Sequence, residues 1–142
     1  MLKPLKVQRS ITLNSTKEKV WDALTNLEHI KQYFFGTETK TDWKVGSPLI
    51  FEGEFEEKKY RDKGRIIKNE PGKLLRYSYW SGFSGLEDKE ENYSTVTYEI
   101  KEVENGVELT VTQEGFANEE KQDHAINGWK MVLDKIKEIV EK

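Results

Sequence analysis

The stretch NEEKQDHAINGWKMVLDKIKEIVE, residues 118–141, predicts one long helix from about Glu119 to Glu141. Asn118 is a favourable N-cap residue, and the acidic side chains of the first turn suit the positive end of the helix dipole. Gly128 stands inside the helix, where glycine costs about 1 kcal/mol relative to alanine. Close approach to the sheet, room for a ligand or simple tolerance would each account for it. Apolar residues form one stripe along this helix: Ala125, Trp129, Val132, Leu133, Ile136 and Val140.

Such a stripe must pack against a second layer, and the preceding sequence predicts that layer to be an antiparallel sheet. Most of the candidate strands alternate apolar with polar residues, which is the period of a half-buried strand. Pro71-Gly72 and Asn105-Gly106 are turn signals of the kind that join neighbouring strands. The strands are expected over residues 7–13, 49–55, 75–79, 96–100 and 109–113, and a further strand follows a turn near Glu57-Lys58 and passes through residues 65–68.

Two short helices are expected between the first strand and the rest of the sheet. Ser15 and Glu18 have the spacing of a capping box, and residues 20–27 supply an apolar helical face. A second helix is expected from Glu28 to Tyr33, and it ends at Phe34-Phe35-Gly36, where glycine permits a turn.

These elements together predict an α+β fold in a single domain, residues 1–142. A curved antiparallel sheet of about seven strands wraps around the long C-terminal helix, and the two short helices lie between the first two strands. A sheet that grips a helix in this way leaves a space wherever the facing side chains do not meet. That space is the first candidate for a ligand site.

Composition narrows the function further. The net charge is −3, from 26 acidic and 23 basic residues, whereas nucleic-acid binders usually carry a basic excess. The chain has no cysteine and only two histidines, His29 and His124, so it offers neither disulfides nor a histidine-rich metal site. We therefore expect no metal and no cofactor. No apolar run approaches the roughly 20 residues that span a bilayer, and we expect a cytoplasmic monomer.

The order of several motifs resembles the family of activators of the heat-shock-protein-90 ATPase, within the START-like (SRPBCC, helix-grip) superfamily. The first is VWDALTN at residues 20–26, and HAINGW at residues 124–129 with Leu133 resembles the closing helix. Leu27 departs from the usual proline, and Gln113 from a common histidine. The intervening matches are EHI (28–30), VG (45–46), Gly64, Pro71, LRYS (75–78), VTYEI (96–100) and LTVTQEGF (109–116).

The resemblance implies a helix-grip fold with a cavity. Members of the superfamily bind lipids, hormones or polyketides, and a few catalyse cyclisations. Full-length chaperone activators carry an additional domain, which we do not expect in this single-domain chain. We therefore expect ligand binding rather than chaperone activity.

We expect the site to be built mainly from aromatic side chains, which give a small-molecule pocket apolar walls with a few polar tips. Phe34, Phe35 and Trp43 are expected to gate it. Arg9 is a candidate anchor for an acidic or phenolic ligand group, with a solvent-facing strand-end position as the equal alternative. For each aromatic residue the alternative is ordinary core. The remaining candidates are Phe51, Phe55, Tyr77, Tyr79, Tyr98, Phe116, His124, Trp129 and Leu133.

The predicted function is binding of a small apolar ligand, lipid-like or phenolic, without catalysis. One alternative is a chaperone-associated stress-response protein that uses its charged surface. A second is a cyclase- or hydrolase-like enzyme, for which the available acid–base groups are Arg9, Tyr77, Tyr98 and His124.

Overall fold

The computed structural model describes residues 2–82 and 85–141, with the side chain of Phe55 left out. Its sheet has seven antiparallel strands in the order β1-β7-β6-β5-β4-β3-β2. The predicted α+β helix-grip fold is confirmed. In chain order the elements are β1 (Lys3–Leu13), α1 (Lys17–Thr25), α2 (Leu27–Tyr33), β2 (Glu38–Lys40), β3 (Pro48–Phe55), β4 (Lys58–Glu70), β5 (Leu74–Tyr79), the short 3-10 helix η1 (Glu90–Asn92), β6 (Ser94–Val103), β7 (Gly106–Phe116) and α3 (Glu119–Val140).

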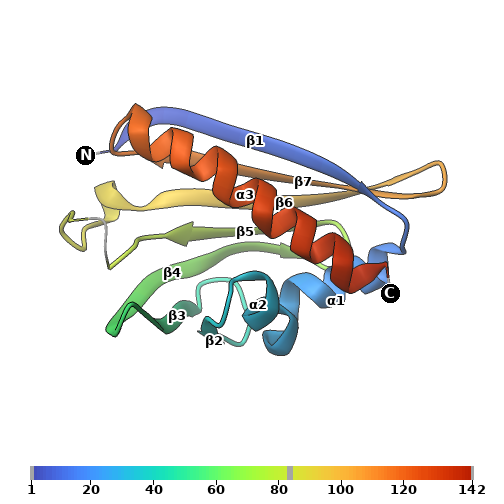
Figure 1. Ribbon diagram of the computed structural model, residues 1–142, viewed down its shortest axis with the longest axis horizontal. Helices are drawn as coiled ribbons and strands as arrows, with labels where there is room; N and C mark the ends of the chain where they lie inside the picture. Colours follow the sequence, from blue (N-terminus) through green and yellow to red (C-terminus); the bar gives the residue numbers. More distant parts are fainter. Residues whose placement is uncertain (1, 83–84, 142) are drawn as a thin grey trace.

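Helix α3 lies across one face of the sheet, and α1 and α2 lie beside it (Figure 1). Its predicted stripe is the buried face: Trp129, Val132, Leu133, Ile136 and Val140 are all buried. The helix begins as predicted, because the Asn118 side chain accepts a hydrogen bond from the Lys121 backbone N–H at 2.9 Å. Leucine, isoleucine and valine side chains from the inward face of the strands complete the core.

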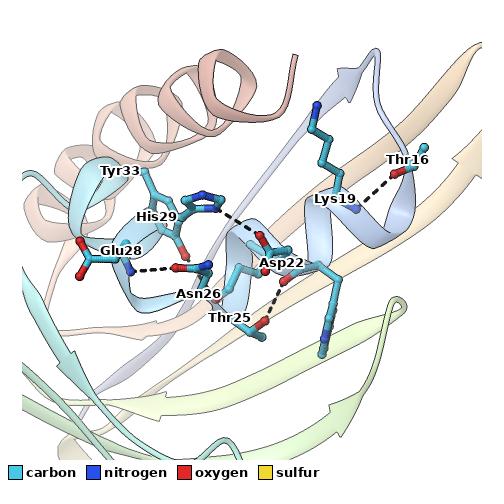
Figure 2. A network of polar contacts seen from close by, with 10 residues as sticks. Thr16, Lys19, Asp22, Thr25, Asn26, Glu28, His29 and Tyr33 are labelled. Atoms are coloured by element: carbon cyan, nitrogen blue, oxygen red, sulfur yellow. Dashed lines mark hydrogen bonds and ion pairs between the residues drawn. The ribbon is translucent and has the colours of Figure 1, made fainter. Parts of the chain in front are cut away.

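Helices α1 and α2, which meet in a corner at Asn26, differ from the prediction in the residue that caps the start of α1. Thr16, not Ser15, caps α1, since its hydroxyl accepts from the Lys19 backbone N–H at 3.2 Å. Asn26 then caps α2 by accepting from the Glu28 N–H at 3.0 Å (Figure 2). Ser and Thr are both good N-caps, so the sequence TLNST offered two adjacent choices.

His29 lies in the same corner, with Nδ1 3.7 Å from the nearest Asp22 carboxylate oxygen (Figure 2). Among residues 2–82 and 85–141, no three His, Asp or Glu side chains are grouped so that they could hold a metal ion. Within the same residues, no helix has the length and apolar character needed to cross a bilayer.

Gly128 faces solvent on α3, and a Cβ there would meet no other part of the chain within 4 Å. Of the three explanations for this glycine, the one that fits is that the helix tolerates a glycine here without a packing or ligand role. We expect Gly128→Ala to raise the free energy of unfolding by about 0.5–1 kcal/mol, because alanine is the better helix former. Urea unfolding measures this, and a lower stability would show that the position has a role that its surroundings hide.

Candidate functional site

A cavity of about 390 Å³ lies between α3 and the concave face of the sheet. Its walls come from the end of α2, from the inward faces of β3 to β7 and from the middle of α3. Most of the lining side chains are aromatic. The described residues that line it are Phe34, Phe35, Thr37, Phe51, Tyr60, Asp62, Tyr77, Tyr79, Val96, Gln113 and Trp129.

Strand alternation explains why these side chains meet. Residues two apart on a strand point to the same face, so Tyr60 and Asp62 on β4, and Tyr77 and Tyr79 on β5, all face the helix. Phe51 on β3 lies directly opposite Asp62 in the β3–β4 ladder. Helix α3 supplies Trp129 from the other side of the cavity.

The aromatic rings form a continuous cluster around Phe51. Its ring centroid lies 5.7 Å from that of Phe34, 6.0 Å from Tyr77 and 6.1 Å from Tyr79. Phe34 in turn packs edge-on against Trp129 at 6.3 Å. Aromatic pairs of this kind add about 0.5–1.5 kcal/mol each beyond the area that they bury, so the cavity has ordered rather than pliable walls.

One side chain in the wall is charged. Asp62 is only 9% exposed, and one carboxylate oxygen accepts a hydrogen bond from the Tyr79 hydroxyl at 2.6 Å. The other oxygen accepts from the Gly82 backbone N–H at 2.9 Å. Burial, and next the charge of Asp62, raise the pKa of the Tyr79 hydroxyl well above its usual range. Tyr79 is therefore a neutral donor at physiological pH.

Three further polar groups, the Gln113 amide and the hydroxyls of Thr37 and Tyr60, are held in fixed positions. The Gln113 side-chain oxygen accepts from the Trp129 indole N–H at 2.8 Å, and its amide nitrogen donates to the Ser94 hydroxyl at 3.1 Å. The hydroxyls of Thr37 and Tyr60 lie 2.6 Å apart. These bonds orient Trp129 and Tyr60 and leave polar edges in an otherwise apolar wall.

Six of the predicted site residues line the cavity: Phe34, Phe35, Phe51, Tyr77, Tyr79 and Trp129. Phe35 stands at the rim, with 62% of its surface exposed. Tyr98 lies behind the wall, where its hydroxyl is 3.4 Å from that of Tyr77. Burial raises the pKa of both tyrosines, so neither is a ready acid or base near neutral pH.

The other predicted residues lie elsewhere. Arg9 does not reach the cavity, because its guanidinium donates to the Ile126 carbonyl on the outside of α3, at 3.4 Å. His124 is exposed on α3, and Phe116 lines a separate depression near the start of that helix. Leu133 is 2% exposed in the core.

Trp43 packs against the core outside the cavity, and its carbonyl accepts from the Asn69 amide at 2.9 Å. The expected gate of Phe34, Phe35 and Trp43 therefore lacks its tryptophan. Phe55 ends β3, but its side chain lies outside the described part of the structure.

Sequence reasoning missed Thr37, Tyr60, Asp62, Val96 and Gln113 as lining residues. A signal existed for two of them, since Tyr60, Asp62, Gly64 and Ile66 alternate along β4. The sequence predicts a strand that follows a turn near Glu57-Lys58 and passes through residues 65–68, and the observed strand runs from Lys58 to Glu70.

Comparison with known proteins agrees with this architecture. Residues 14–141 match the family model described as Activator of Hsp90 ATPase homolog 1-like protein. The solution structure of ChR145 from Cytophaga hutchinsonii is 38% identical, with a TM-score of 0.84 over 99% of this chain and 96% of that one.

Two more distant structures share the fold. Protein CV1439 from Chromobacterium violaceum is 21% identical, with a TM-score of 0.83 over 96% of this chain and 97% of that chain. The Aha1 dimer from Colwellia psychrerythraea is 17% identical, with a TM-score of 0.77 over 96% of each chain. No curated protein matches the sequence.

Proposed function

The chain belongs to the Activator of Hsp90 ATPase homolog 1-like family, and from this premise we propose that it binds a small apolar molecule in the cavity beneath α3. The observation that carries the proposal is the aromatic cavity of about 390 Å³. Ligand sites are typically clefts of ~300–1,000 Å³ with mostly apolar walls and a few placed polar groups. The wider fold family generally binds hydrophobic ligands, which points the same way.

The ligand would be a flat or flexible apolar body with one or two polar groups, of phenolic or lipid-like kind. Its rings or chain would pack against Phe51, Tyr77 and Trp129. Its polar group would face the end of the cavity where Asp62 and Tyr79 meet.

We propose binding without catalysis. No histidine or lysine is among the described lining residues. The carboxylate of Asp62 is engaged by Tyr79 and Gly82, and burial, which raises the pKa of the Tyr77 and Tyr79 hydroxyls, keeps those two groups protonated. General acid–base catalysis needs a group that titrates near the working pH. A chaperone-associated role ranks second, because the family description alone supports it.

An amide NMR titration against a small set of phenolics, lipids and aromatic amines tests the proposal. We expect saturable shifts at backbone amides of Phe51, Tyr77, Val96 and Trp129, with the outer face of α3 unaffected. Shifts confined to exposed residues of α3, or no saturable shift with any compound, would contradict cavity binding.

A blocking variant sharpens this test. Val96 is buried in the cavity wall on β6, so Val96→Phe is expected to fill space that a ligand needs and to weaken binding at least about tenfold, a factor worth roughly 1.4 kcal/mol. Ile67→Phe makes a similar enlargement on the exposed side of β4 and should leave affinity unchanged. Equal affinities for both variants would place the ligand elsewhere.

A further inference from the structure

Asp62 gives the wall of the cavity a negative charge. It is the one charged side chain among the described residues that line the cavity, and the rest are aromatic, aliphatic, hydroxyl or amide groups. A ligand that enters this space therefore meets a negative charge and no lining group of positive charge in the described residues.

The carboxylate has hydrogen bonds but, in the described part of the chain, no counter-ion. The Tyr79 hydroxyl and the Gly82 N–H donate to it. Among residues 2–82 and 85–141, no lysine, arginine or histidine forms an ion pair with it. The neighbouring Lys63 is directed instead to Asp88. Buried charges in proteins are normally paired, so this one is an exception that needs a reason.

The carboxylate also has capacity left. An ionised carboxylate offers about four acceptor positions on its two oxygens, and the Tyr79 hydroxyl and the Gly82 N–H take one position on each oxygen. A donor carried by a ligand can therefore bond to Asp62 without displacing Tyr79 or Gly82.

The surroundings suit a cation better than a neutral donor. Phe51 and Tyr79 pack with ring centroids 6.1 Å apart, next to Asp62, and ring faces attract positive charge. A charge-assisted hydrogen bond is roughly twice as strong as a neutral one. A ligand carboxylate, by contrast, would face Asp62 with like charge, and no described lining residue carries a positive charge to offset it.

We infer that the cavity selects ligands with a protonated amine on an apolar body, the ammonium group bonding to Asp62 and the apolar part packing among the aromatic rings. This inference rests on the proposed binding function and narrows its ligand class. It also reverses the expectation, based on Arg9, that an acidic ligand group would be anchored.

Three probes of similar shape and different head group test it: phenylbutylamine, phenylbutanol and phenylbutyrate. Each is titrated at neutral pH and constant salt against the full chain, with amide shifts as the readout. We expect the amine to bind at least about tenfold more tightly than the acid, with the alcohol between them. Equal affinities, or a preference for the acid, would overturn the inference while leaving cavity binding intact. If none of the three binds, the proposed function fails with it.

Two variants separate charge from shape. Asp62→Asn removes the charge at nearly constant size and is expected to bring the amine and acid affinities to within about twofold of each other. Tyr79→Phe removes a hydroxyl from the same place but keeps the carboxylate, and should retain the preference for the amine. Loss of the preference in Tyr79→Phe but not in Asp62→Asn would contradict the assignment. The wild-type comparison stands even if one variant folds poorly.

Discussion

Replacing Gly64 by alanine is expected to lower the free energy of unfolding by about 3 kcal/mol or more. A Cβ at this position would lie 1.7 Å from the Ser78 carbonyl oxygen on β5. The obstacle is backbone and not a flexible side chain, so β4 and β5 would have to separate. The two strands are bridged on either side, by Lys63 with Trp80 and by Ile66 with Tyr77, which leaves them little freedom to move.

The same change should weaken ligand binding, because β4 carries Asp62 and Tyr60 into the cavity wall. Chemical denaturation gives the stability, and Gly128→Ala is the matched control, since that substitution of the same kind is expected to act in the opposite direction. A Gly64→Ala protein as stable as the wild type would mean that β4 and β5 are not as close as described.

Replacing Trp129 by alanine is expected to cost about 3–5 kcal/mol, the usual range for a buried tryptophan. Trp129 is 8% exposed, and its ring packs at 5.9 Å from Tyr98 and 6.3 Å from Phe34. The change also removes the indole N–H that donates a hydrogen bond to the Gln113 side-chain oxygen. The middle of α3 would lose its main contact with the cavity wall.

Two controls divide this cost into parts. Trp129→Phe keeps a ring but loses the hydrogen bond, and should cost about 1–3 kcal/mol, less than alanine. Met131 is 57% exposed on the same helix, so Met131→Ala should change stability by no more than about 0.5 kcal/mol. Thermal or urea unfolding measures all three. Equal losses for Trp129→Ala and Met131→Ala would contradict the packing of α3.

The arrangement of the helix and sheet layers could be predicted from the sequence because apolar residues recur with a different period in helices and in strands. The 3.6-residue stripe from Ala125 to Val140 defines α3, and the alternation around Phe51, Tyr77 and Val96 defines strands. Turn residues at Pro71-Gly72 and Asn105-Gly106 place β4 beside β5 and β6 beside β7. These are local signals, and the structure agrees with them.

The members of the site could be predicted only in part, because a cavity is set by long-range geometry. Arg9 shares the inward face of β1 with Val7, but β1 lies at the far edge of the sheet from β3 and β4. The inward period alone therefore does not separate Arg9 from Asp62. Strand order decides which inward residues meet, and that order appears only once the sheet is assembled.

The most direct test of the central claim is to measure intermolecular NOEs between the chain and the tightest of the three phenylbutyl probes. Cavity binding predicts NOEs from the phenyl protons of the probe to the Val96 methyl groups and to the ring protons of Phe51 and Trp129, which line the cavity together. NOEs found only to exposed side chains of α3, such as Ile126 and Met131, would contradict it.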